Sequence, residues 1–135
     1  MRVELIAFTA RGNALAERLA AELTGAGCPA ACTRGGLRVE EWAARAFGRS
    51  EALVFVGAAG IAVRAIAPCL RHKSTDPAVV VVDEAGRYAV PILSGHLGGA
   101  NDLARRIAAL TGAEAVLTTA TDVNGVFAAD QWARR

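Results

Sequence analysis

Short apolar runs alternate along this chain with segments of helical periodicity, and that alternation limits the fold more than any other feature of the sequence. Residues 52–56 read A-L-V-F-V and residues 78–82 read A-V-V-V-V, with no polar residue in either run. Such runs are typical of strands that are buried on both faces of a parallel sheet. Because helical segments separate most of them, right-handed crossovers should place helices on both faces. The sequence therefore predicts an α/β protein with a three-layer α/β/α sandwich.

The order of the elements follows from the same pattern. Strands are predicted over residues 2–8, 29–33, 52–56, 78–82, 87–93 and 115–119. Helices are predicted over residues 14–24, 39–47, 61–67 and 99–110, with a turn over 9–13 before the first helix. The turn D-E-A-G joins strand 78–82 to strand 87–93, which predicts an antiparallel hairpin. The sheet should thus be mixed but mostly parallel, with about five to six strands.

Length and composition indicate one ordinary soluble domain. The chain has 135 residues, of which 53% are hydrophobic, enough for a single buried core. Its apolar runs are far shorter than a membrane span, and the first run carries charges that a signal peptide would lack. We therefore expect a cytoplasmic protein with no membrane contact.

Charge and cysteine content exclude several classes of function. The formal net charge is +2 and the basic residues are scattered among acidic ones, which argues against a nucleic-acid partner. The three cysteines, Cys28, Cys32 and Cys69, form no C-x-x-C pair, so neither a disulfide framework nor a zinc site is expected. No phosphate-binding signature is present either. We expect no metal site in the protein.

Glycines and hydroxyl side chains gather in the loops after several predicted strands. These loops are residues 9–13, 57–60, 94–101 and 118–122. In open α/β sheets, ligands bind outside the carboxyl ends of the strands. We therefore expect the four loops to share one rim, and that rim to be the functional face.

The strongest single candidate is the strand-to-helix corner V-P-I-L-S-G-H-L-G-G-A-N-D-L over residues 90–103. His96 can act as an acid or a base near neutral pH. The N–H groups of Gly98, Gly99 and Ala100 would face a bound carboxylate or oxyanion if they point out of the helix start. The alternative for His96 is a loop residue whose ring binds backbone groups.

Each of the other candidates also has a structural alternative. Asn101 and Asp102 are placed to cap the helix, and Asp122 to form an Asx turn. Arg64 could bind a carboxylate of a ligand, and the structural alternative is an arginine exposed on the surface of its helix. Lys73, the only lysine, provides a compact ammonium group. Asp76, which precedes Pro77, is most simply a turn residue.

Four strings of the sequence resemble the N-terminal part of the CbiG family of cobalamin biosynthesis proteins. They are G-A-A-G-I-A-V-R-A-I-A-P (57–68), K-S-T-D-P-A-V-V-V-V-D (73–83), L-S-G-H-L-G-G-A-N-D-L-A (93–104) and T-T-A-T-D (118–122). The resemblance implies a cobalt-precorrin-5A hydrolase, which opens the ring-A δ-lactone and releases acetaldehyde to give cobalt-precorrin-5B. The cobalt belongs to the substrate, and no cofactor is implied.

The resemblance, joined to the residue chemistry, gives a set of expected site residues. The catalytic set is His96, Asp102 and Lys73. The set expected to bind the tetrapyrrole is Thr9, Gly12, Gly57, Gly60, Arg64, Ser94, Gly95, Gly98, Gly99, Asn101, Thr119, Thr121 and Asp122. Residues 1–120 are expected to form the CbiG N-terminal-like domain. Residues 121–135 are expected to begin the segment leading to a C-terminal domain, which is the expected protein partner.

Two other functions stay open at this point. The domain could bind a corrinoid without catalysing its conversion, with a C-terminal domain supplying the catalytic groups. It could also be a flavodoxin-like binder of phosphate or nucleotide.

Overall fold

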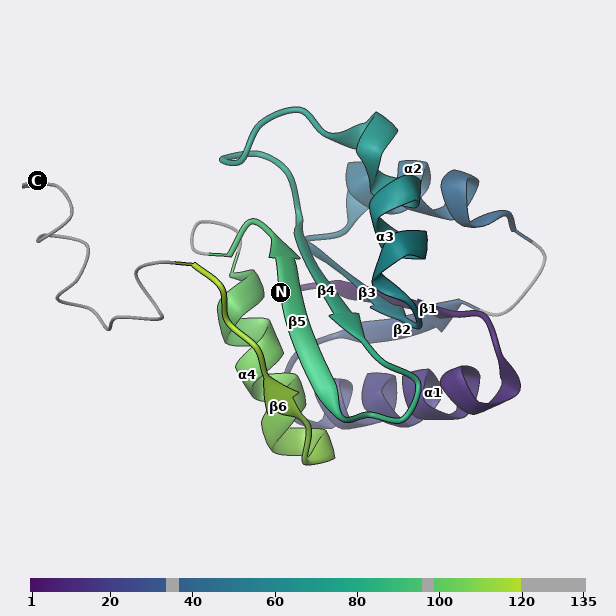
Figure 1. Ribbon diagram of the computed structural model, residues 1–135, viewed down its shortest axis with the longest axis vertical. Helices are drawn as coiled ribbons and strands as arrows, with labels where there is room; N and C mark the ends of the chain where they lie inside the picture. Colours follow the sequence, from purple (N-terminus) through teal and green to yellow (C-terminus); the bar gives the residue numbers. More distant parts are fainter. Residues whose placement is uncertain (34–36, 96–98, 120–135) are drawn as a thin grey trace, which may run out of the picture.

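A single mixed sheet organises the fold (Figure 1). The computed structural model describes residues 1–33, 37–95 and 99–119. Its strands are β1 (Val3–Ala7), β2 (Ala30–Thr33), β3 (Ala52–Val56), β4 (Ala78–Val82), β5 (Tyr88–Leu93) and β6 (Glu114–Ala115). Its helices are α1 (Ala10–Gly25), α2 (Val39–Arg49), α3 (Ala59–Ile66) and α4 (Ala100–Thr111), with a 3₁₀ turn, η1 (Ala67–Cys69). The predicted α/β class is confirmed.

The strand order is β2-β1-β3-β4-β5-β6, and every neighbouring pair is parallel except β4 with β5. The predicted hairpin is therefore confirmed. Helices α1 and α4 pack on one face of the sheet, and α2 and α3 pack on the other. Among the described residues, no helix is long and apolar enough to cross a membrane.

The central strands supply side chains to two separate clusters. Leu5, Val54 and Val80 face α1 and α4, whereas Leu53 and Phe55 face α2 and α3. All five are fully buried, as expected for strands covered on both faces. Burial of this much apolar surface is the main stabilising term of the domain.

Several helices begin or end at other residues than the sequence predicted. Helix α1 begins at Ala10, because Thr9 caps it: the Thr9 Oγ1 atom accepts the N–H of Gly12 at 3.0 Å. Residues 10–13 are therefore a helical turn and not the predicted loop. Helix α2 continues two residues beyond the predicted 39–47, and α3 begins two residues before the predicted 61–67.

The last strand is also shorter than predicted. Residues 115–119 were expected to be extended, but β6 contains only Glu114 and Ala115. Its partners on β5 are Tyr88 and Ala89 alone. A strand is defined by its hydrogen-bonded pairing with a neighbour, so β6 ends after Ala115, the last residue that pairs with β5.

The hairpin has a consequence for the loops. Because β5 runs against β4, it ends where β1, β3 and β4 begin. β6 pairs with the start of β5 and runs in the same direction, so the chain after β6 continues toward that side, where the Asn101 Nδ2 atom donates to the Thr119 hydroxyl. We call this side of the sheet the amino edge, and the side where β1, β3 and β4 end the carboxyl edge. Residues 9–13 and 57–60 lie at the carboxyl edge, whereas 94–95, 99–101 and 118–119 lie at the amino edge (Figure 1). The expectation that all four loops share one rim is wrong.

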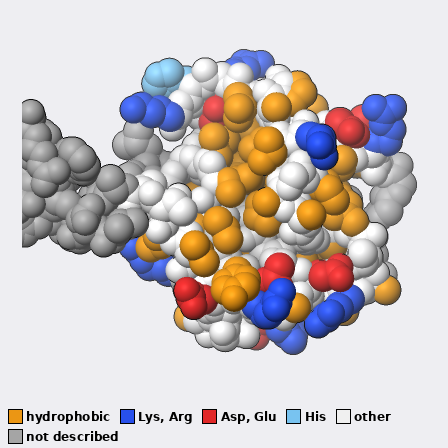
Figure 2. Space-filling model, in the orientation of Figure 1, with side chains coloured by type: hydrophobic (Ala, Val, Ile, Leu, Met, Phe, Trp, Pro, Cys, Tyr) orange, Lys and Arg blue, Asp and Glu red, His pale blue; other side chains and the backbone are white. Residues whose placement is uncertain are grey.

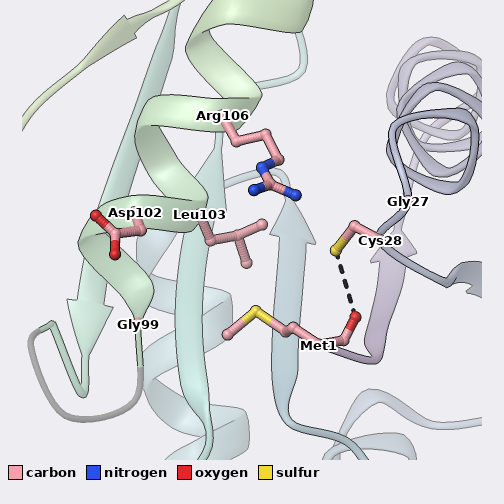
Figure 3. Close-up of a pocket in the computed structure, with 7 residues that line it drawn as sticks. All are labelled: Met1, Gly27, Cys28, Gly99, Asp102, Leu103 and Arg106. Carbon is pink, nitrogen blue, oxygen red and sulfur yellow. Dashed lines mark hydrogen bonds between the residues drawn. The ribbon is translucent and has the colours of Figure 1, made fainter.

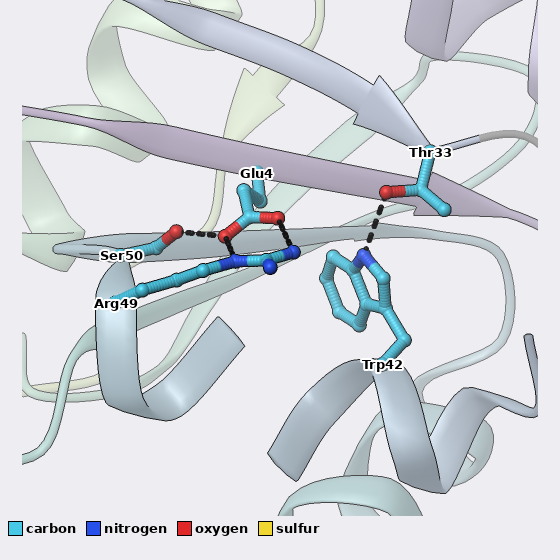
Figure 4. A network of polar contacts seen from close by, with 5 residues as sticks. All are labelled: Glu4, Thr33, Trp42, Arg49 and Ser50. Atoms are coloured by element: carbon cyan, nitrogen blue, oxygen red, sulfur yellow. Dashed lines mark hydrogen bonds and ion pairs between the residues drawn. The ribbon is translucent and has the colours of Figure 1, made fainter. Parts of the chain in front are cut away.

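A buried carboxylate joins the middle of the sheet to helix α2 (Figure 4). Glu4 of β1 is only 5% exposed. Arg49 donates to it from Nε and Nη2, at 2.9 and 2.7 Å, and the Ser50 hydroxyl donates to the same carboxylate. The hydrogen bonds from Arg49 lower the pKa of Glu4, against the opposing effect of burial. Nearby, the Trp42 indole N–H donates to the Thr33 hydroxyl at 2.9 Å.

This geometry predicts unequal effects for the two partners. Glu4→Gln should lower the free energy of unfolding at pH 7 by about 1–2 kcal/mol, because the charge-assisted hydrogen bonds are lost. Arg49→Met should cost more than Glu4→Gln, because it leaves the buried carboxylate with the Ser50 hydroxyl alone. Urea unfolding monitored by circular dichroism measures both. Arg105→Met, which removes an exposed ion pair with Asp102, is the matched control and should stay within about 0.5 kcal/mol.

The same pair predicts a pH dependence. Since the folded state lowers the pKa of Glu4, its stabilisation is fully present above the unfolded pKa and is lost as the pH falls through the folded pKa. The stability gap between wild type and Glu4→Gln should therefore close on acidification. A gap that stays constant from pH 7 to pH 3 would contradict this assignment.

Candidate functional site

The corner between β5 and α4 is closed by its own hydrogen bonds. Ser94 adopts a left-handed backbone with φ of 58°, which is uncommon for a residue with a side chain. Its hydroxyl donates to the Asp76 carbonyl at 3.0 Å. Its own carbonyl accepts the N–H of Ala100 at 3.1 Å, and the Gly95 carbonyl accepts the N–H of Asn101 at 3.1 Å. These bonds hold the end of β5 against the first turn of α4.

The same bonds correct one expectation about anion binding. The N–H of Ala100 was expected to face a ligand, but it is bonded to the Ser94 carbonyl. Gly99 precedes the helix with φ of 83°, and its carbonyl accepts the N–H of Leu103. The start of α4 is therefore partly occupied by the loop itself, which reduces its capacity to bind an anion through these amides.

Asn101 and Gly95 form the tightly packed centre of the corner. Asn101 is 3% exposed, and its Nδ2 atom donates to the Thr119 hydroxyl at 3.1 Å. A Cβ atom added to Gly95 would lie 3.0 Å from the Asn101 Oδ1 atom and 3.1 Å from the Thr119 Cγ2 atom. A side chain at Gly95 thus has no room unless one of these neighbours moves. Asn101 links two distant strings of the sequence, a role that its position in the first helical turn did not reveal.

Asp102 and Lys73 do not approach this centre in the way the sequence suggested. The Asp102 side chain is 88% exposed and accepts a hydrogen bond from Arg105 Nη1 at 3.0 Å. Lys73 lies in the exposed segment before β4 and makes no ion pair with a described residue. Its segment is joined to the described part of the corner by the bond between Ser94 and Asp76.

Asp76, which the sequence indicated as a turn residue, is a buried residue at a cavity. It is 9% exposed, and both of its carboxylate oxygens accept the N–H of Arg71 at 3.1 Å. It lines a cavity of about 580 Å³ between α2 and residues 68–77, together with Phe47 and Leu70. Burial and the charge of Asp76 raise the pKa of the Cys69 thiol in the same cavity, which disfavours the reactive thiolate. The D-P sequence alone gave no sign of this cavity.

The remaining candidates lie at the carboxyl edge, around the point where the connections from β1 and β3 diverge. A cavity of about 380 Å³ opens there, lined by Phe8, Thr9, Gly57 and Glu84 among others. The Thr9 hydroxyl donates to Glu84 Oε2 at 2.6 Å, and a Cβ on Gly57 would lie 3.1 Å from the Phe8 ring. Asp83 also lines the cavity, and two carboxylates disfavour a phosphate ligand there.

Three more candidates complete the account of the carboxyl edge. Gly12 lies in the first turn of α1, where an added Cβ would lie 3.2 Å from Thr9 Oγ1. Gly60 and Arg64 lie one turn apart on α3, with the guanidinium over the glycine. The length of the strands separates these residues from the corner, which lies at the opposite edge of the sheet.

Four of the expected site residues lie outside the described residues: His96, Gly98, Thr121 and Asp122. Within the described ranges, no group of three or more His, Cys, Asp or Glu side chains is arranged to hold a metal ion.

The chain has clear relatives. It matches a family model described as "Cobalamin synthesis G N-terminal" over residues 41–122. It is 47% identical over 139 residues to a cobalt-precorrin-5A hydrolase from Salmonella typhimurium, covering 95% of this chain and 38% of that protein. It is also 47% identical over 83 residues to a cobalt-precorrin-5A hydrolase from Priestia megaterium, covering 62% of this chain and 22% of that protein.

A solved structure agrees with these matches. A cobalamin biosynthesis protein G homolog from Sulfolobus solfataricus superposes with a TM-score of 0.75 at 26% identity, over 86% of this chain and 36% of that chain. In each comparison the chain spans well under half the length of its relative.

The packing of the corner predicts the effect of a single added methyl group. Gly95→Ala should lower the free energy of unfolding by about 1–3 kcal/mol, because the new Cβ displaces Asn101 or Thr119. The side-chain amide signals of Asn101 in an NMR spectrum should shift at the same time.

Gly48→Ala is the matched control for this variant. Gly48 lies within α2, and nothing lies within 4 Å of an added Cβ. That substitution should raise stability by about 0.5–1 kcal/mol, as alanine favours a helix over glycine. Equal effects of the two substitutions would show that the corner is not tightly packed.

Proposed function

Because the chain belongs to the cobalamin synthesis G N-terminal family, we propose that it contributes to the opening of the ring-A δ-lactone of cobalt-precorrin-5A. It is a homologue of cobalt-precorrin-5A hydrolases of cobalamin biosynthesis. The proposed products are cobalt-precorrin-5B and acetaldehyde, and the cobalt enters and leaves with the substrate. The chain spans 38% of the Salmonella relative, and we propose that the complete reaction also uses residues from elsewhere in the family protein.

One observation carries this proposal. Residues 73–77, 93–95, 99–104 and 118–119, which belong to three of the four family-like strings, lie together at the amino edge. Ser94 bonds to Asp76 and Asn101 bonds to Thr119 across these strings. Segments that are distant in sequence are thus joined at one place, as expected for a functional surface.

The proposed reaction has two chemical stages. Water adds to the lactone carbonyl, the ring carbon–oxygen bond breaks, and the leaving alkoxide takes a proton. A base then removes the proton of that hydroxyl, and the carbon–carbon bond to the macrocycle breaks. Acetaldehyde leaves, and the bonding electrons stay on the macrocycle carbon, which accepts a proton.

We assign the proton transfers of these stages to His96, because an imidazole can donate or accept a proton near neutral pH. Lys73 is proposed to stabilise negative charge on the substrate. Asp102 is proposed to act from the exposed side of α4 once substrate covers the corner. Substrate contacts are assigned to the amino-edge residues Ser94, Gly95, Gly99, Asn101 and Thr119, with Gly98, Thr121 and Asp122 as further members of the set.

The carboxyl-edge residues need a separate assignment. They lie at the edge of the sheet opposite the corner, so we propose that they form a second surface of the domain. They are Thr9, Gly12, Gly57, Gly60 and Arg64. We also propose that residues 1–120 form the domain and that 121–135 begin the connection to a C-terminal domain. The family match, which ends at residue 122, supports this boundary.

A second function, corrinoid binding without catalysis, is favoured by a specific observation. The first amides of α4 are bonded within the corner, and Asp102 turns to solvent, so few catalytic groups converge among the described residues. Exposed hydrophobic side chains also gather over α3 and β5 (Figure 2). Val63 and Tyr88 are 52% and 45% exposed there, which suits contact with a C-terminal domain that would complete the site.

Acetaldehyde release, together with the effect of His96→Ala on it, separates the two functions. Cobalt-precorrin-5A is supplied to this chain alone, to the C-terminal part of a family protein alone, and to both together. Release from the mixture but from neither part alone is the expected result, because the site is shared. Substrate binding by this chain with no acetaldehyde from any sample that contains it would leave the binding function and overturn the catalytic one.

The role of His96 is tested in whichever of these samples is active. His96→Ala should lower turnover by about 10²-fold or more, as expected for the loss of a general acid or base. His72, the other histidine, accepts the N–H of Ser74 within an exposed loop and serves as the control. Turnover that is unchanged in His96→Ala, or reduced equally in His72→Ala, would contradict the assignment.

A further inference from the structure

A small cavity at the amino edge lies beside the corner, on the face of the sheet that α1 and α4 cover (Figure 3). Its volume is about 220 Å³. Met1, Gly27 and Cys28 line one side, and Gly99, Asp102, Leu103 and Arg106 of the α4 region line the other. Neither the sequence patterns nor the family-like strings pointed to Arg106.

Two residues with charged side chains line this cavity, Asp102 and Arg106, and the side chain that reaches over it is that of Arg106. Its guanidinium reaches over the cavity toward Cys28, whereas Asp102 points away on the other side of α4 (Figure 3). Asp102 lies one turn before Arg106, but its carboxylate bonds to Arg105 at 3.0 Å. Arg106 makes no ion pair with any residue of the described ranges. A guanidinium in this position is available to a bound anion.

Apart from Asp102 and Arg106, the walls of the cavity are apolar or bare backbone. Leu103 and Cys28 are each 3% exposed, and the Cys28 thiol donates to the Met1 carbonyl at 3.3 Å. Gly27 and Gly99 both have positive φ, of 88° and 83°, which favours glycine over residues with side chains. A Cβ on Gly99 would lie 3.1 Å from the Met1 Cε atom. Glycine at position 99 therefore avoids this contact where the cavity meets the corner.

We propose that this cavity binds one carboxylate arm of the tetrapyrrole substrate, an inference that rests on the proposed function. Pockets for whole drug-sized ligands are about 300–1,000 Å³, so 220 Å³ suits a side arm and not the macrocycle. The methylene groups of an acetate or propionate arm pack against Leu103 and Met1. The planar guanidinium of Arg106 binds the carboxylate with two parallel hydrogen bonds.

The position of the cavity explains why such a site is useful. Gly99 lines the cavity and also precedes the first turn of α4, two residues before Asn101. An arm held by Arg106 would therefore orient the macrocycle over the corner. Holding a non-reacting arm is a general way to position a large substrate.

The test compares two corrinoids that differ only in the charge of their arms. Cobyrinic acid carries free carboxylates, and its heptamethyl ester has the same macrocycle without them. Binding of each to this chain is measured by equilibrium dialysis. Arg106→Ala should weaken binding of cobyrinic acid by about 10-fold, and Arg106→Lys by less, because lysine keeps the charge but not the paired hydrogen bonds. The ester should bind the wild type and both variants equally.

Arg105→Ala is the control, because it removes the neighbouring cation on the same helix, which is engaged with Asp102. It should change the affinity for cobyrinic acid by less than about 2-fold. Equal affinity of wild type and Arg106→Ala, or an equal loss in Arg105→Ala, would overturn the assignment whether or not acetaldehyde is released.

A simple dicarboxylate distinguishes failure of this site from failure of the proposed function. Glutarate is titrated while the amide signals of Gly99 and Leu103 are followed by NMR. If neither corrinoid binds but glutarate shifts these signals in the wild type and not in Arg106→Ala, the carboxylate site stands and the tetrapyrrole function fails. If glutarate shifts neither signal and cobyrinic acid binds independently of Arg106, the site fails and the function stands.

Discussion

The antiparallel pairing of β5 with β4 is the constraint on which the proposed functional surface depends. The first four strands are parallel and send their connections out at the carboxyl edge, where such sheets usually bind ligands. The hairpin reverses the chain, so β5 ends at the opposite edge and the residues after β6 run toward it. There the corner meets the segment before β4 through the bond from Ser94 to Asp76. A functional surface at this edge is therefore a product of one hairpin.

Tight backbone packing gives this surface its shape. Ser94 holds a left-handed conformation while its carbonyl and that of Gly95 bind the first amides of α4. Gly95 lies so close to Asn101 that a methyl group does not fit without movement. Such an arrangement fixes the direction in which α4 leaves the sheet. It also fixes where the cavity beside Arg106 and the cavity beside Asp76 open, on opposite faces of the same edge.

Electrostatics separate the two edges further. Asp83 and Glu84 line the carboxyl-edge cavity. At the amino edge, Arg106 reaches over the small cavity, while Asp102, which also lines it, points its side chain away. An anionic ligand with several carboxylates is repelled by the first and attracted by the second. The buried carboxylate of Glu4 takes no part in this contrast, because Arg49 and Ser50 bind it within the α2 face. The distribution of charge thus supports the proposed substrate at one edge and disfavours it at the other.

The sequence by itself determined the class of fold, because apolar runs such as 52–56 and 78–82 have few alternatives to buried strands. It also determined the hairpin and the family, through local turn chemistry and strings of residues that are contiguous in the chain. Only the tertiary structure decided which loops meet. Packing between distant segments, such as Ser94 against Asp76 and Asn101 against Thr119, depends on contacts that no local pattern records. For that reason Thr9 and Gly57, which were expected beside the corner, lie at the other edge of the sheet. Asp76 contacts the corner and Arg106 lines the cavity beside it, although neither was expected there.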